Sequence, residues 1–352
     1  MVPMSLPVLL LVLASLLAPI LPSRLLPGLP RLVSNASAAT PDARPHRTIR
    51  VVVPWADGAS PDAASLAGPF AQALAHTIGK PVLLDHRPGL DGALAAEIVA
   101  NAPPDGHTIL LASGELLLSC LRRTRLTGPG CNVERDLAPI TLLTLSGSVL
   151  VTGNRPDAPA SFSALASPPP VGAGKPVRSY ASAGFGSSSH LAAEHLRQSG
   201  SLAAAHRPHA DLAAAAIAVA RGGADVMVVP LAVAQAGIRD GSLRPLAVTG
   251  GYRSYALPAV PHLGEFGTDS RVLDWHALWS PRKTPVQTRQ SLQAAVAEAL
   301  DRQEILHAWN SRGAEQGGQP MQVLELLVRS ETLKWTRTIH TLGNVGIGPI
   351  RP

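Results

Sequence analysis

Short apolar segments alternate with amphipathic segments along most of this chain. Residues 48–54 (TIRVVVP) form a β-branched apolar run of the length typical of a buried strand. Residues 62–78 repeat apolar positions at helical spacing and are followed by Gly79, a common helix terminator. Two further apolar runs lie at 81–85 and 107–112, with a short helical segment at 93–101 between them. This strand–helix order with short loops predicts a parallel sheet covered by helices on both faces.

The same alternation continues after a less regular stretch at 116–139. Gly and Pro residues indicate an exposed loop at 168–175. We therefore predict an α/β protein whose two halves each fold around their own sheet. The further strands are expected at 140–144, 149–152, 178–181, 203–206, 224–229 and 243–249, and the further helices at 188–198, 212–221, 285–302, 302–311 and 321–342.

The first forty residues carry a targeting pattern. Residues 8–21 (VLLLVLASLLAPIL) are apolar but too few to span a bilayer comfortably, and a small-x-small cleavage site ends at Ala38. We expect a signal peptide at 1–38, cleaved near Ala38, a linker at 39–47, and export of the mature chain. Residues 1–7 carry no Lys or Arg, which a signal peptide usually has, so an uncleaved anchor is the alternative.

Composition narrows the class of protein. The chain has 352 residues, of which 46% are hydrophobic, 3% aromatic and 15% charged, with 30 Lys and Arg against 24 Asp and Glu. This length suits two domains, and the chain is too apolar to be disordered. A single long apolar run argues against a polytopic membrane protein. Scattered basic residues and few aromatic rings favour an anionic small molecule or a negatively charged surface over a nucleic acid as the partner.

The two cysteines, Cys120 and Cys131, are too few for a zinc-ribbon or iron–sulfur site. They bracket a short segment rich in Gly, Pro and Arg, and export permits disulfides, so we expect them to pair. Closing this loop would stabilise the fold by about 2–3 kcal/mol in the chain-entropy model. Two free buried thiols are the alternative. No paired His or redox spacing makes either cysteine a catalytic candidate.

The strongest candidate for binding chemistry is the segment 179–196 (SYASAGFGSSSHLAAEHL). Gly184 and Gly186 follow a strand and let the backbone approach a ligand closely. Three serines at 187–189 then begin a helix, where free N–H groups and the positive end of the macrodipole can bind an anion. A serine that merely caps the helix is the alternative.

A loop of the same design lies at 54–62 (PWADGASPD), between a strand and a helix. Considered by itself, this loop could be an ordinary turn in which Ser60 or Asp62 caps the following helix. The presence of two such loops, one in each half, is stronger evidence for a binding site than either loop alone. In open α/β sheets, ligands bind at the carboxyl ends of the strands, in the crevice between the halves.

Several further motifs follow in a fixed order from residue 48 to the C-terminus. They are IRVVVP at 49–54, RPG at 87–89, PDGHT at 104–108, DLAPIT at 136–141, YASAG at 180–184, GSSSHL at 186–191, GGADVM at 222–227, LRPLAVT at 243–249 and LPAVP at 257–261. In order and spacing they resemble the Bug family of periplasmic solute receptors. Members of that family are the extracytoplasmic binding components of tripartite tricarboxylate transporters.

The resemblance implies a two-lobed, periplasmic-binding-protein-like (type II) fold with hinge strands between the lobes. Residues 48–145 and 250–352 would form lobe 1, and residues 146–249 would form lobe 2. The implied function is that of a monomeric periplasmic receptor, without a cofactor. It closes on a small organic carboxylate, such as a dicarboxylate, and delivers it to membrane transporter subunits.

By position, the resemblance places the ligand between the first loop, the Gly/Ser loop and a strand end in lobe 2. A nearby arginine, Arg207, is a candidate cation. The remaining expected ligand-binding residues are Trp55, Asp57, Gly58, Ala59, Ser60, Phe185, Gly186, Ser187, Ser188, Ser189, Val229 and Pro230.

The chain departs from the family pattern in the first loop, where Ala59, Ser60 and Pro61 replace a Gly-rich centre. In the second loop, Asp91 would repel an anion unless it faces solvent or a ligand amine. These departures favour an alternative function, a degenerate receptor that acts as a ligand-sensing or protein-interaction component.

An enzyme is not expected. Ser189 and His190 are sequence neighbours, which rarely face each other on a helix, and no Gly-x-Ser-x-Gly elbow suggests a hydrolase. His206 and His209 lack a third ligand, so no metal site is expected.

Overall fold

The computed structural model describes residues 47–56, 61–127, 131–166, 178–268, 271–310 and 314–346, and all of them belong to one compact unit. The predicted signal peptide at 1–38 lies outside the described residues. The centre of the first loop, residues 57–60, also lies outside them.

The described strands form one continuous sheet in the order β2-β1-β3-β9-β4-β7-β5-β6, with β8 and β10 also paired to β4. Their bounds are β1 Ile49–Val53, β2 Val82–His86, β3 Thr108–Ser113, β4 Leu137–Gly153, β5 Arg178–Ser182, β6 Ala204–Pro208, β7 Val226–Pro230, β8 Leu243–Val248, β9 Leu273–Pro281 and β10 Glu315–Gln316.

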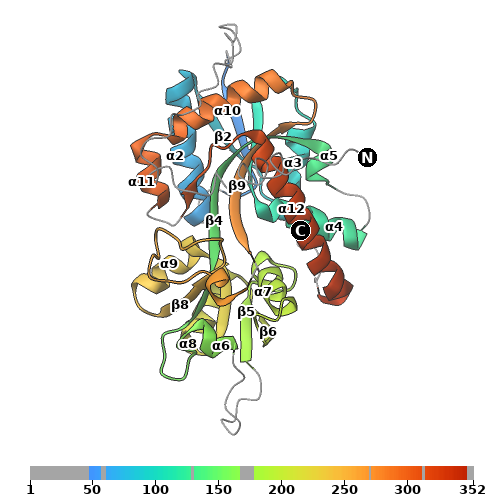
Figure 1. Ribbon diagram of the computed structural model, residues 1–352. Coiled ribbons are helices and arrows are strands. Elements are labelled where there is room, and N and C mark those ends of the chain that lie inside the picture. The colour runs from blue at the N-terminus through green and yellow to red at the C-terminus, as the bar shows by residue number, and fades with distance from the viewer. Residues whose placement is uncertain are drawn as a thin grey trace, which may run out of the picture. The chain divides into compact units, whose positions relative to one another are not determined.

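The sheet has two parallel sets of strands, as the alternating pattern predicts, but the two halves share this one sheet through β4 and do not each have their own. In one set β1 is parallel to β2 and β3, and in the other β5 is parallel to β6 and β7. We call the half built on β1, β2 and β3 lobe 1, and the half built on β5, β6, β7 and β8 lobe 2. Between them run β4 and β9, which are antiparallel to each other (Figure 1). The predicted α/β fold with hinge strands between two lobes is confirmed.

Helices cover both faces of the sheet in each lobe (Figure 1). None of the described helices is both long enough and apolar enough to cross a membrane. The bounds are α2 Pro61–Ile78, α3 Ala93–Ala100, α4 Gly114–Thr127, α5 Val133–Asp136, α6 Phe162–Ala166, α7 Ser188–Gln198, α8 Leu212–Arg221, α9 Leu231–Arg239, α10 Val286–Leu300, α11 Gln303–Asn310 and α12 Met321–Gly346, with short 3-10 turns η2 Leu90–Gly92 and η3 Leu263–Phe266.

One wrong prediction concerns β4, which is a single strand of 17 residues rather than two strands at 140–144 and 149–152. The sequence between them contains Gly147. In the structure a Cβ at Gly147 would lie 2.5 Å from the backbone nitrogen of Gly250. This glycine therefore allows two backbones to meet where β4 passes from one lobe to the other.

A second wrong prediction concerns the stretch 116–139, which contains α4 and α5 rather than irregular chain. Leu116, Leu117 and Cys120 recur at helical spacing and are buried in the lobe 1 core. Cys120 is disulfide-bonded to Cys131, with their Cα atoms 5.2 Å apart. The disulfide ties the middle of α4 to the segment just before α5.

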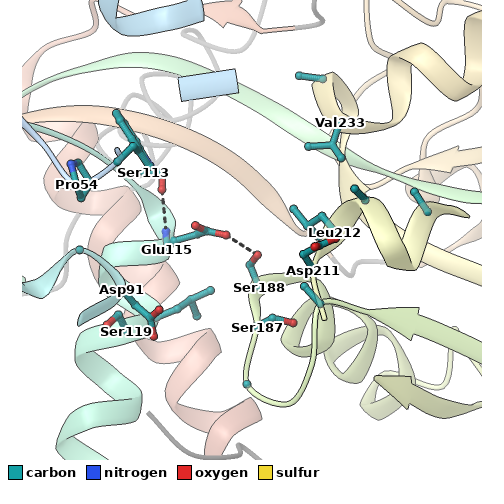
Figure 2. Close-up of a pocket in the computed structure, with 18 of the residues that line it drawn as sticks. Pro54, Asp91, Ser113, Glu115, Ser119, Ser187, Ser188, Asp211, Leu212 and Val233 are labelled. Carbon is teal, nitrogen blue, oxygen red and sulfur yellow. Dashed lines mark hydrogen bonds between the residues drawn. The ribbon is translucent and has the colours of Figure 1, made fainter. Parts of the chain in front are cut away.

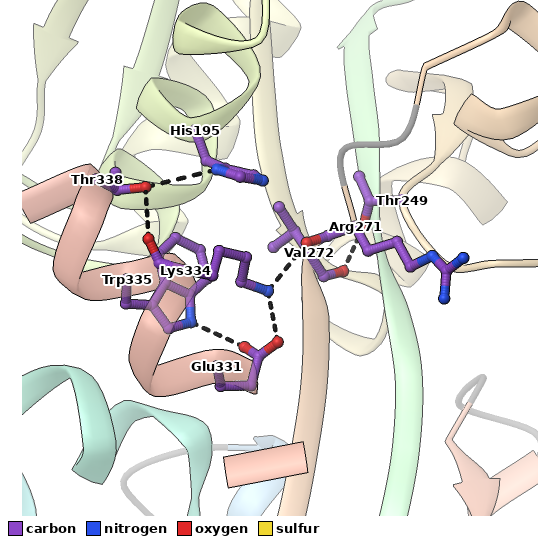
Figure 3. A network of polar contacts seen from close by, with 8 residues as sticks. All are labelled: His195, Thr249, Arg271, Val272, Glu331, Lys334, Trp335 and Thr338. Atoms are coloured by element: carbon purple, nitrogen blue, oxygen red, sulfur yellow. Dashed lines mark hydrogen bonds and ion pairs between the residues drawn. The ribbon is translucent and has the colours of Figure 1, made fainter. Parts of the chain in front are cut away.

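The C-terminal helix α12 spans both lobes. Its Val328 packs in the lobe 1 core, whereas its Trp335 packs in the lobe 2 core. Between them, Lys334 Nζ lies 2.5 Å from Glu331 Oε1 and donates to the Arg271 carbonyl at 3.0 Å, and Trp335 Nε1 donates to Glu331 Oε2 at 2.8 Å (Figure 3). Burial lowers the pKa of Lys334. The helix therefore carries a buried ion pair beside the hinge.

Candidate functional site

A cavity of about 1020 Å³ lies between the lobes and is lined by both of them (Figure 2). From lobe 1 it receives Trp55 after β1, Asp91 in the β2–α3 loop, and Ser113 and Glu115 at the end of β3. From lobe 2 it receives the Gly/Ser loop after β5 and the facing sides of α8 and α9. The cavity thus lies where the carboxyl ends of parallel strands meet.

The Gly/Ser loop uses one of its serines internally. Ser187 Oγ accepts a hydrogen bond from the His190 N–H at 3.2 Å and donates to the Gly184 carbonyl at 2.7 Å, so Ser187 is the cap of α7. Ser188 and Ser189 occupy the first turn of α7, where helix geometry leaves N–H groups without intrahelical acceptors. Of these two residues, Ser188 lines the cavity, so its N–H and hydroxyl groups are donors that the loop can offer to an anion.

A buried histidine cluster holds the loop from behind. The Gly186 N–H donates to His190 Nδ1 at 3.0 Å, and the His190 ring stacks on His206 with centroids 4.1 Å apart. Burial lowers the pKa of His190 to about 3, with the neighbouring His206 acting in the same direction. His190 is therefore neutral near neutral pH, and its Nδ1 is free of a proton and can accept this bond.

Two hydrogen bonds join the lobes across the cavity. Ser188 Oγ donates to Glu115 Oε1 at 2.7 Å (Figure 2), and the Arg122 guanidinium donates to the Gly186 carbonyl at 2.8 Å. Arg122 also lies 3.6 Å from the Asp91 carboxylate. Next to Glu115, the carboxyl of Asp274 has its pKa raised to about 7 by burial and by the Glu115 charge. Among the described residues that line the cavity, the three carboxylates Asp91, Glu115 and Asp211 therefore outnumber the one cation, Arg122.

The structure brings some of the predicted ligand-binding residues together. Trp55, Gly186, Ser187 and Ser188 all line the cavity. Asp57, Gly58, Ala59 and Ser60 lie outside the described residues, so their role stays a prediction.

The other predicted residues do not line this cavity. Phe185 is 47% exposed and its ring edge contacts His206, while Ser189 is buried and its Oγ accepts from the Ala183 N–H. The exposed Arg207 lies on β6, the buried Val229 lies on β7 in the lobe 2 core, and Pro230 borders a separate small cavity. Their assignment as ligand contacts stays a prediction.

Sequence reasoning missed Glu115 and Asp211 and the apolar wall formed by α8 and α9. Glu115 directly follows β3, just as Trp55 follows β1, so the same strand-end rule could have identified it. Asp211 caps α8 by accepting from the Ala214 N–H at 2.7 Å. Within the part of the chain that the structure describes, no group of three or more His, Cys, Asp or Glu residues could hold a metal ion.

Comparisons of the chain with a family model and with known proteins identify the same family. The family model described as "Tripartite tricarboxylate transporter family receptor" matches residues 67–344. The chain is 30% identical over 309 residues to a UPF0065 protein from the tcbD-tcbE intergenic region of Pseudomonas sp. (strain P51), covering 87% of this chain and 89% of that protein. It is 27% identical over 327 residues to Protein BugT of Bordetella pertussis, covering 91% and 98%.

Solved structures agree. A TctC solute binding protein from Polaromonas has a TM-score of 0.72 at 23% identity, covering 85% of this chain and 99% of that one. MatC from Rhodopseudomonas palustris, with bound malate, has a TM-score of 0.65 at 30% identity, covering 84% and 99%. R. palustris Rpa4515, with adipate, has a TM-score of 0.67 at 25% identity, covering 87% and 99%.

Proposed function

Because the chain belongs to the tripartite tricarboxylate transporter receptor family, whose members are periplasmic solute-binding receptors and not enzymes, we propose that it captures a small organic carboxylate between its lobes and delivers it to the membrane subunits of such a transporter. The proposal includes export to the periplasm, cleavage near Ala38 and action as a monomer. The site residues that we propose are Trp55, Gly186 and Ser188.

The observation that carries this proposal is that one cavity is lined by strand ends from both lobes. A ligand that contacts both lobes stabilises the closed arrangement, which a receptor needs in order to signal occupancy to its transporter. The Ser188 N–H and hydroxyl groups supply donors for a carboxylate at the positive end of α7. The malate and adipate bound by two relatives support a carboxylate as the ligand class.

Calorimetry tests the proposal. The mature protein, from residue 39, would be titrated with a panel of carboxylates that includes malate and adipate. For a carboxylate that binds, Ser188→Ala should weaken affinity about tenfold, because a hydrogen bond to a charged group is lost. Ser330→Ala, at an exposed position of α12, is the matched control. Equal affinity in both variants would contradict the proposed anion position.

A second candidate function is a ligand-sensing or protein-interaction component that has kept the fold. One observation favours it: the Ser188 hydroxyl is engaged by Glu115, a carboxylate of the protein itself. This candidate predicts that no carboxylate of the panel binds at millimolar concentration.

A further inference from the structure

We propose that the ligand is a monocarboxylate with an apolar tail, and that the tail lies in an apolar arm of the cavity between α8 and α9. This inference rests on the proposed function, because it assigns the part of the ligand that extends away from the α7 N-terminus. The apolar arm is defined by Ala216, Ile217 and Ala220 of α8, Val233 and Ala236 of α9, and Leu243 of β8.

The arm exists because α8 is apolar on two faces. Its Ala215 and Val219 are fully buried in the lobe 2 core. Its other face, which includes Ala216 and Ile217, lines the cavity, and Ile217 is 52% exposed. A helix that is apolar all round normally has its whole surface covered. The second face of α8 is thus an apolar surface inside a cavity, which an apolar ligand group would cover.

The facing wall has the same character. Val233 and Ala236 of α9 present small apolar side chains to the cavity, and Leu243 lies beside them. Figure 2 shows Val233 and Leu212 on the lobe 2 side of the cavity, with Leu212 beside Ser188 and Val233 farther from the Gly/Ser loop. The volume of about 1020 Å³ lies at the upper end of the range for small-molecule sites, so it can hold more than a four-carbon diacid.

Charge excludes a second carboxylate from the arm. Among the described residues that line the cavity, Arg122 is the sole Lys, Arg or His, and it is engaged at the polar end with Gly186 and Asp91. Of the described residues of α8 and α9 that line the cavity or cap these helices, Asp211, the cap of α8, is the ionisable one in the lining. A carboxylate in the arm would lose its hydration without gaining a cation and would be repelled by Asp211. An alkyl chain has neither cost.

A matched pair of probes tests this inference. Hexanoate and adipate have the same six-carbon chain, and only adipate carries a second carboxylate. Calorimetry should show that hexanoate binds at least about tenfold more tightly than adipate or malate. Adipate or malate binding as tightly as hexanoate would overturn the inference and leave the proposed function standing. Failure of all three to bind at millimolar concentration would overturn both.

A pair of variants on one helix locates the tail. Ala216→Gln places a polar group in the arm and should weaken hexanoate binding about fivefold or more. Ala214→Gln, on the same helix and equally half-buried but away from the cavity, should bind like the wild type. Equal hexanoate affinities for the two variants would overturn the placement of the tail between α8 and α9.

Discussion

Glu115 should weaken the binding of any anion at the N-terminus of α7, so Glu115→Gln should bind carboxylates more tightly than the wild type does. Its Oε1 lies 2.7 Å from Ser188 Oγ, and the two atoms face each other across the cleft. A ligand carboxylate that accepts from Ser188 must displace Glu115 from this hydroxyl and remain next to its charge. Glutamine keeps the size and an acceptor oxygen but removes the charge.

The magnitude follows from this geometry. A ligand oxygen at hydrogen-bond distance from Ser188 would lie about 5 Å from the Glu115 carboxylate, where two unit charges repel by about 0.8 kcal/mol at the dielectric constant of water. Glu115 is exposed, so this lower limit applies rather than the larger value of a dry interior. The expected gain in affinity is therefore about fourfold.

Calorimetry at two salt concentrations is the assay. The gain should be largest at low salt and should shrink at about 0.5 M salt, where charges are screened within a few ångströms. Glu304→Gln, at an exposed position on α11, should leave affinity unchanged. A lower affinity in Glu115→Gln would refute the reasoning, because it would mean that the bond between Glu115 and Ser188 favours the binding-competent closed form more than its charge opposes the ligand.

Three further predictions concern stability. Removing the disulfide by Cys120→Ala with Cys131→Ala should lower the free energy of unfolding in urea by about 3 kcal/mol, because the disulfide closes a loop of sequence separation 11. An unchanged urea midpoint would contradict this prediction. Lys334→Met should cost about 3 kcal/mol because Glu331 is left charged and buried, and adding Glu331→Gln should restore most of that loss. As pH falls below 6.5, the unfolded state gains a proton at His190 that the folded state, with a pKa of about 3, does not, so stability should fall by up to about 1.4 kcal/mol per pH unit. His190→Gln should show a shallower slope between about pH 6 and 4 in urea unfolding, and equal slopes would count against the assignment.

The fold was largely predictable because buried parallel strands are continuous apolar runs. The run at 48–54 became β1 and the run at 107–112 became β3. The errors arose where local signals conflict with tertiary packing. Gly147 marks a close approach of two backbones rather than a strand end. The periodicity of α4 was obscured by the Gly- and Pro-rich sequence that follows it.

The site was predictable only in part, because its two sides come from different lobes. The glycines and serines after β5 and the strand end at Trp55 indicated two walls of the cavity. Nothing in the sequence near Ser188 shows that Glu115, far away along the chain, lies opposite it. The alanines of α8 look like core residues, and only the packed structure shows that one of their faces lines a cavity.

The relative size of these effects indicates which part of the ligand decides selectivity. The positive end of α7 stabilises an anion by about 0.3–1 kcal/mol at an exposed site, whereas Glu115 opposes it by about 0.8 kcal/mol. These two contributions nearly cancel, so the binding free energy at the polar end depends mainly on direct hydrogen bonds. This free energy therefore differs little between one carboxylate and another. Burying a methylene group contributes about 0.8 kcal/mol. Three or four methylenes against Ile217 and Val233 would therefore outweigh the net charge effects, and a ligand without an apolar tail would forgo the largest gain that this cavity offers.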